Sequence, residues 1–137
     1  MTALTDTAYT LGGSTSLDFA DAVARVRETL KEEGFGVLTE IDVQATLQEK
    51  LGKDMPPYLI LGACNPPYAH QALELEPELG ALLPCNVVVY RQPDGTTRVS
   101  AVDPVAMLGI VGRPELEPIA DEIEEKIERA LQKVWAA

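Results

Sequence analysis

Hydrophobic residues recur with a helical period near both ends of the chain. The first stripe steps by four, three and four residues through Phe19, Val23, Val26 and Leu30. This spacing predicts an amphipathic helix, with Ser16 as its N-cap and Gly34 as its stop. A second stripe predicts a final helix that begins near Pro118. Its apolar members are Ile119, Ile123, Ile127, Leu131 and Val134.

Two central segments are apolar almost without interruption. Residues 58–64 read YLILGAC and residues 82–90 read LLPCNVVVY. A nearly continuous apolar run is typical of a strand that is buried on both faces. Residues 82–90 and 96–103 flank the sequence RQPDG, which predicts a hairpin with its turn at residues 93–95.

The remaining segments predict weaker elements. Residues 7–12 form a weak strand, and the run GFGVLTEI forms another, with Phe35, Val37, Thr39 and Ile41 on one face. Asp42 is expected to cap a short helix that ends at Gly52 and turns its apolar stripe inward. That stripe comprises Val43, Leu47 and Leu51.

These elements follow in the order β-α-β-α-β-α-β-β-α. The length of 137 residues fits a single domain over residues 1–137. Three helix-containing connections allow parallel pairings, whereas the closing hairpin is antiparallel. We therefore predict a compact α+β domain with a mixed sheet of about five strands covered by helices.

The charge balance excludes two classes of general partner. Eleven basic residues against 22 acidic ones give this acidic protein a net charge of −11. Nucleic acid and anionic membranes attract basic surfaces, so neither is expected to bind. The first residues lack the basic and apolar regions of a signal peptide, which favours a cytoplasmic protein.

The candidate chemistry lies in two Cys-Asn pairs. The chain has two cysteines, Cys64 and Cys85, each followed by an asparagine, Asn65 or Asn86, and its single histidine is His70. Three soft ligands are one short of the usual zinc set, and no C-x-x-C spacing is present, so we predict no metal. Two interpretations of the cysteines are left. The first is thiol chemistry, either a reactive Cys64 at the start of a helix or reversible pairing of Cys64 with Cys85, and the second is that both are small buried packing residues.

Three sequence blocks carry a family resemblance. GFGVLTEID, ILGACNPP and LPCNV, in this order, resemble the uncharacterised prokaryotic family numbered 302 among the domains of unknown function. The resemblance extends from Ser16 to about Pro104. It implies a compact α+β domain that forms a homodimer, and it implies no reaction, substrate or catalytic residue.

Two functional hypotheses therefore stand side by side. In the first, Cys64, Asn65, His70, Cys85 and Asn86 surround a pocket for a small molecule or a thiol ligand. In the second, the protein is a dimeric structural or adaptor module without chemistry. No nucleotide, dinucleotide or catalytic motif is present, so no cofactor is predicted and enzymatic activity is left open. In either case we expect a homodimer that packs through a sheet edge or the terminal helix.

Overall fold

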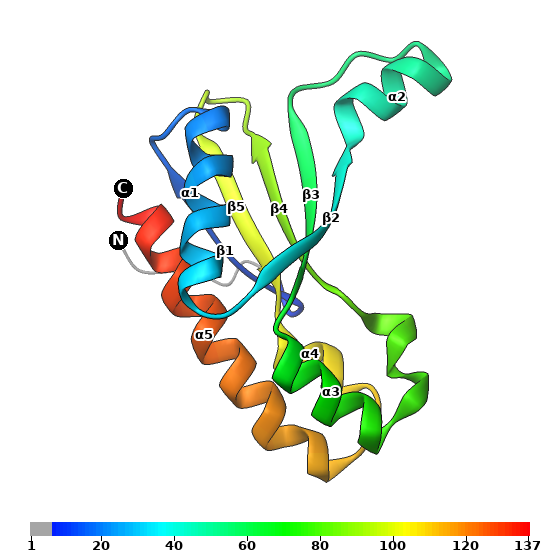
Figure 1. Ribbon diagram of the computed structural model, residues 1–137. Coiled ribbons are helices and arrows are strands. Elements are labelled where there is room, and N and C mark those ends of the chain that lie inside the picture. The colour runs from blue at the N-terminus through cyan, green and yellow to red at the C-terminus, as the bar shows by residue number, and fades with distance from the viewer. Residues whose placement is uncertain (1–6) are drawn as a thin grey trace.

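The strands of the computed structural model, which describes residues 7–137, form one sheet in the order β1-β5-β4-β3-β2 (Figure 1). They are β1 (Thr10–Thr15), β2 (Gly36–Asp42), β3 (Tyr58–Cys64), β4 (Cys85–Arg91) and β5 (Thr97–Val102). The predicted α+β class, the five strands and the β4–β5 hairpin are confirmed. The prediction of a mixed sheet is wrong in one respect, because all four pairings are antiparallel. The connection from β2 to β3 and the connection from β3 to β4 each contain a helix. Both connections join neighbouring antiparallel strands, so neither is a parallel crossover.

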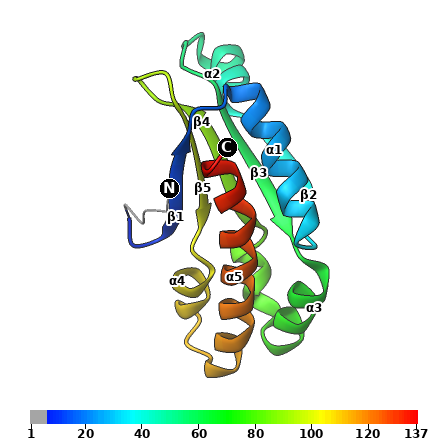
Figure 2. The same ribbon diagram turned by 90° about the vertical axis from the view of Figure 1, so that its left-hand side faces the viewer.

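Two long helices cover one face of the sheet (Figure 2). The α-helices are α1 (Phe19–Glu32), α2 (Val43–Leu51), α3 (Pro66–Leu75), α4 (Pro104–Gly109) and α5 (Glu117–Trp135), and the 3-10 helices are η1 (Pro77–Leu82) and η2 (Pro114–Leu116). The predicted α5 stripe is buried along its whole length, and it packs with α1 on one hydrophobic core. Full burial of each such aliphatic side chain contributes about 1.5–3 kcal/mol, so this core dominates the stability of the fold.

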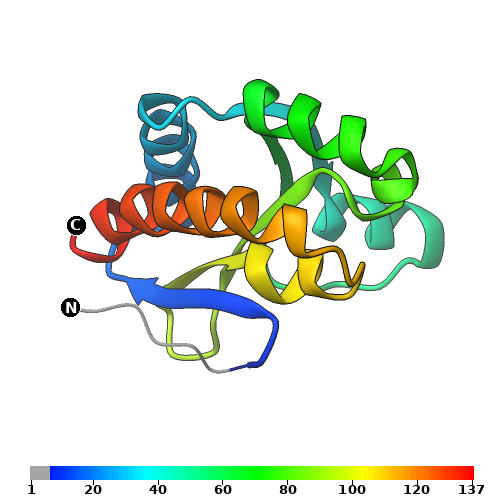
Figure 3. The ribbon, with the colours of Figure 1, turned by 90° about the horizontal axis from the view of Figure 1, so that it is seen from below.

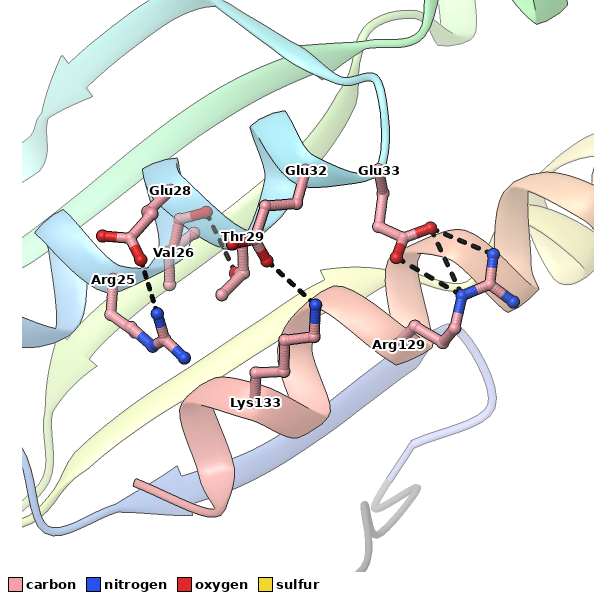
Figure 4. Close-up of polar contacts among 8 residues, drawn as sticks. All are labelled: Arg25, Val26, Glu28, Thr29, Glu32, Glu33, Arg129 and Lys133. Atoms are coloured by element: carbon pink, nitrogen blue, oxygen red, sulfur yellow. Dashed lines mark hydrogen bonds and ion pairs between the residues drawn. The ribbon is translucent and has the colours of Figure 1, made fainter.

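Ion pairs at the protein surface join α1 to α5 (Figure 4). Arg129 Nη2 lies 3.0 Å from Glu33 Oε1, and Lys133 Nζ lies 2.9 Å from Glu32 Oε1. Arg129 also lowers the pKa of Glu33, mainly through its hydrogen bond to that carboxylate. Exposed pairs of this kind contribute at most about 1 kcal/mol each, so they orient the two helices more than they stabilise them.

The first strand and its helix begin later than the sequence predicts. The strand covers Thr10–Thr15 instead of residues 7–12, and Gly13 in this strand faces the ring of Trp135. Trp135 Nε1 donates a hydrogen bond to the carbonyl of Val99 at 3.0 Å, which fixes the end of α5 against the sheet. The N-cap of α1 is Asp18 and not Ser16, because the helix starts at Phe19 and Asp18 accepts from its first turn.

The segment from β2 to α2 departs furthest from its predicted packing. An irregularity between Val37 and Thr39 resets the alternation of β2, so the two residues lie on different faces and the predicted single stripe is broken. Asp42 caps α2 as predicted, with its side chain accepting from Ala45 N. The prediction that α2 turns an apolar stripe inward is wrong, because none of the residues of this helix is buried and Leu51 is 66% exposed. The helix extends beyond the end of the sheet and finds no core there (Figure 1).

None of the helices within residues 7–137 combines the length and apolar character that crossing a membrane requires.

Candidate functional site

An apolar cavity of about 300 Å³ lies at the end of β3 and β4, beneath α3 and beside α4 and α5. Figure 3 shows these helices gathered at one end of the sheet. The lining side chains are mainly aliphatic, aromatic or sulfur-containing, and none carries a charge. They belong to Phe35, Leu38, Ala63, Cys64, Asn65, Tyr68, Ala69, Ala72, Leu73, Leu83, Pro84, Cys85, Met107, Leu108 and Ile123, with Gly80 completing the wall.

The antiparallel pairing of β3 with β4 brings the two cysteines to this cavity. Ala63 and Cys85 are partners in the register, and Cys64 follows Ala63 at the end of β3. After Cys64 the chain passes through α3 and η1 and then returns to the same end of the sheet at Cys85. A parallel crossover would have placed the two thiols at opposite ends of the sheet.

Both thiols are free, and neither is activated by its surroundings. Burial raises the pKa of the Cys64 thiol, and burial with the nearby Cys64 raises the pKa of Cys85 to about 11. The nucleophile in thiol chemistry is the thiolate, and a raised pKa leaves very little of it near neutral pH. The cavity therefore offers two neutral, polarisable sulfur atoms and does not favour nucleophilic catalysis.

Asn65 joins two chain segments at the cavity wall. It occupies the N-cap position of α3, but its side chain makes no capping hydrogen bond. Its Nδ2 instead donates to the carbonyl of Glu33 at 3.2 Å, and its amide packs against Gly34. Gly34 has φ of 89°, the left-handed conformation that glycine adopts readily. The side chain thus fixes the α1–β2 turn to the start of α3.

The other two predicted site residues lie outside the cavity. His70 is on the exposed side of α3, where its Nε2 lies 3.1 Å from Glu74 Oε1 and its side chain is 75% exposed. Asn86 is exposed on the sheet, opposite Gly62 in the register. The structure thus brings Cys64, Asn65 and Cys85 together and separates them from His70 and Asn86.

Several cavity residues were missed because they come from distant segments. Met107, Leu108 and Ile123 arrive from α4 and α5, and no local spacing relates them to the Cys-Asn pairs. Leu38 was missed as well, because the irregularity of β2 that turns it toward the cavity arises from the pairing with β3. Its side chain is 67% exposed at the edge of the cavity.

A second hollow of about 410 Å³ lies between α4 and the start of α5. Charged side chains of Arg113, Glu117 and Asp121 line it. Arg113 is already engaged there, since it donates to the carbonyl of Leu75 and pairs with Glu115 at 3.3 Å. The basic group of this lining is therefore already paired, which leaves the carboxylates of Glu117 and Asp121 facing the hollow. Among residues 7–137, no three His, Cys, Asp or Glu side chains form a group that could hold a metal ion.

Comparison with known proteins places the chain in one family. The sequence profile of the domain of unknown function DUF302 matches residues 13–134. The chain is also similar to the crystal structure of an uncharacterized conserved protein DUF302 from Bacillus stearothermophilus. The two share 35% sequence identity with a TM-score of 0.87, over 93% of this chain and 99% of the other. No curated protein matches the sequence.

Proposed function

The chain belongs to the DUF302 family, and we propose that its domain binds a small, uncharged apolar molecule in the cavity lined by Cys64 and Cys85. The observation that carries this proposal is the uncharged, largely apolar lining of a cavity of about 300 Å³. Ligand cavities are typically roughly 300–1,000 Å³ and lined mainly by apolar side chains with a few polar groups.

The size and lining of the cavity support a small, neutral, mainly apolar ligand. An apolar cavity of roughly 150 Å³ is enough for benzene, so a molecule with two fused rings or a short branched chain fits here. A charged group would lose its hydration without gaining an ionic partner from the lining, which disfavours ionic ligands. The Asn65 Oδ1 can accept a hydrogen bond from a neutral ligand, whereas the Asn65 Nδ2 already donates to Glu33 and the Tyr68 hydroxyl is hydrogen-bonded to Glu122.

Fluorescence of 1-aminonaphthalene, a two-ring dye that is neutral near pH 7, tests this binding. The variant Ala69→Phe adds a ring to the wall of the cavity, whereas Ala24→Phe adds the same ring to an exposed position on α1. We expect saturable binding with a stoichiometry of one for the wild type and Ala24→Phe, and its loss in Ala69→Phe. Binding that is unsaturable, or equal in all three folded proteins, would contradict the proposal.

The proposal does not depend on thiol chemistry. A Cys64→Ser, Cys85→Ser double variant is expected to bind the dye more weakly, because two hydroxyls make the lining more polar, but not to lose binding. The cytoplasmic location stays a prediction of the sequence.

A further inference from the structure

The outer edge of β1 carries backbone N–H and C=O groups that no other strand in the described part of the chain bonds. β1 lies at one end of the sheet, and it pairs with β5 alone. The carbonyl of Tyr9 accepts a hydrogen bond from Asp103 N at 2.8 Å, so these two residues form a hydrogen-bonded pair. Because such pairs alternate along an antiparallel ladder, Thr10, Gly12 and Ser14 direct their N–H and C=O groups away from β5.

The two edges of the sheet differ in their protection against a further strand. Edge strands are commonly blunted by charged side chains, by proline or by a bulge. β2 has two of these features, since it carries Glu40 and Asp42 and has an irregularity between Val37 and Thr39. β1 reads TLGGST, so it has no charge and no proline, and its register with β5 is continuous over all six residues. β1 is therefore the edge that is open to strand addition.

An acidic stripe on α5 runs beside this edge. Four acidic residues share one side of the helix, because they follow one another at steps of four, three and four positions. These residues, here called the acidic stripe, are Glu117, Asp121, Glu124 and Glu128. Trp135 lies on the same side and faces Gly13 of β1, whereas Lys133 lies on the side that pairs with α1. Since α5 lies between β1 and α1 (Figures 2 and 3), the stripe is turned toward β1 and away from α1.

The acidic stripe meets the start of β1 at Asp103, whose N–H is bonded to Tyr9. Burial, a hydrogen bond with Asp103 and the charges of Glu128 and Asp121 raise the pKa of Glu124 to about 7. These carboxyl groups therefore lie close together and repel one another when they are ionised. A positive charge brought beside β1 would relieve this repulsion, because an opposite charge favours the ionised form of a carboxyl group.

The other face of the sheet beside β1 has a different chemistry. Arg98 extends over Gly12, and Gln92 Nε2 donates a hydrogen bond to Ser14 Oγ at 2.9 Å. A basic side chain on this face would meet the guanidinium of Arg98, so a neutral polar residue such as threonine suits it. Successive side chains of a strand point to opposite faces. A complementary strand therefore alternates basic residues toward α5 with neutral residues on the other face.

A second copy of this chain does not match these requirements. Its own β1 has no basic residue to offer. Pairing of two β1 edges about a two-fold axis perpendicular to the sheet would also place both acidic stripes side by side on one face of the joined sheet. Opposed like charges of this kind cost several kcal/mol, so the partner is a different protein.

We propose that the β1 edge binds an extended, basic segment of another protein by strand addition. The main chain of that segment bonds to Thr10, Gly12 and Ser14, and its Lys or Arg side chains lie beside the acidic stripe of α5. None of these residues lines the cavity that holds Cys64 and Cys85, so the proposal is independent of ligand binding there.

Fluorescence anisotropy with two labelled peptides tests the strand pairing. In the first peptide four threonines alternate with three lysines. The second peptide has proline in place of the two inner threonines, so it keeps the charge but loses N–H groups that point to β1. We expect saturable binding of the first peptide and at least about 10-fold weaker binding of the second. Absence of binding by the first peptide, or equal binding of both, would overturn the proposal.

Two charge reversals on α5 test the role of the acidic stripe. Glu128→Lys lies on the stripe, whereas Glu125→Lys makes the same change of net charge at an exposed position outside it. Reversing one charge turns an attraction into a repulsion, so we expect at least about 10-fold weaker binding of the first peptide by Glu128→Lys. Binding by Glu125→Lys should stay within about 2-fold of the wild type. Equal affinity of the two variants would contradict the proposed side of approach.

Amide hydrogen exchange of the wild type, followed by nuclear magnetic resonance, locates the contact without any substitution. We expect the amides of Thr10, Gly12 and Ser14 to exchange rapidly in the free protein and to gain protection when the first peptide is added. The other three amides of β1 are bonded to β5 and should be protected in both states. Unchanged exchange at the three outward amides would overturn the proposal. Protection that rises with protein concentration alone would assign the edge to a second copy and would overturn it too.

Discussion

Pro84 packs against the backbone of Gly62, so that a Cβ atom at Gly62 would lie 2.8 Å from Pro84 Cγ and would also clash with the Thr39 hydroxyl. This close approach lets β2, β3 and the start of β4 converge beside the cavity. Glycine is required at this position by the space available, because its φ is not in the left-handed region.

The replacement Gly62→Ala is expected to lower the free energy of unfolding by about 1–3 kcal/mol, the usual cost of overpacking. Gly36→Ala in the neighbouring strand is the control, because nothing lies within 4 Å of its added methyl group. Urea denaturation followed by the fluorescence of Trp135, the one tryptophan of the chain, measures both. Equal stability of the two variants would show that Pro84 and Thr39 move aside freely.

The two cavity thiols are expected to react slowly with iodoacetamide near neutral pH. Their raised pKa values keep them protonated, and Cys85, with a pKa of about 11 and a buried side chain, should react more slowly than the partly buried Cys64. The reaction rate should rise with pH well beyond the range in which an ordinary thiol levels off. Mass spectrometry of alkylated peptides assigns each site, and rapid reaction of either thiol in the folded protein at neutral pH would contradict this assignment.

The same raised pKa values favour the folded state only while the thiols are neutral. Their contribution is complete below the pKa of an unfolded thiol, about 8.5, and it is lost as the pH rises through the folded values. The double variant Cys64→Ser, Cys85→Ser should therefore lose less stability than the wild type in alkaline solution.

Glu124 on α5 should make the stability of the protein depend on pH near neutrality. Burial, a hydrogen bond with Asp103 and the neighbouring carboxylates raise the pKa of Glu124 from 4.5 to about 7. A raised folded pKa stabilises the protein fully below 4.5, and this contribution is lost as the pH rises through 7. Asp103 caps α4 by accepting from Val105 N and Ala106 N, so repulsion between the ionised pair acts on the contact between α4 and α5.

Glu124→Gln is expected to flatten the pH dependence of the unfolding free energy and to be more stable than the wild type in mildly alkaline solution. Glu125→Gln, at an exposed position of the same helix, should leave the wild-type slope unchanged. Denaturation curves recorded across the neutral pH range compare the three proteins. If the unfolding free energy of Glu124→Gln changes with pH as steeply as that of the wild type, the pH dependence comes from other groups.

Local patterns in the sequence predict an element well where the residues that define it lie within that element or its adjoining turn. The α5 stripe, the β4–β5 hairpin and the cap at Asp42 each follow from residues a few positions apart. The relative direction of β3 and β4 depends on whether the chain through α3 crosses over to a parallel strand or turns back to an antiparallel one. The local sequence pattern is the same in both cases. The irregularity beside Leu38 depends on the pairing of β2 with β3, which no short window contains.

The candidate site could be predicted only in part for the same reason. Cys64, Asn65 and Cys85 lie at strand ends, where the register alone brings them together. His70 follows Asn65 closely in sequence, but the helical period turns it to the exposed side of α3, where it pairs with Glu74. The α4 and α5 walls of the cavity come from the C-terminal part of the chain, and only tertiary packing places them against β3.

The most direct test of ligand binding is the anomalous diffraction of crystals soaked in bromonaphthalene. This neutral two-ring probe matches the class of ligand that we propose, and its bromine atom reports position without reliance on a dye. We predict a bromine peak inside the cavity, in contact with Cys64 and Cys85, in wild-type crystals and no such peak in Ala69→Phe crystals. Wild-type crystals with bromine only at other surfaces, or with a cavity that stays free of bromine, would contradict the account.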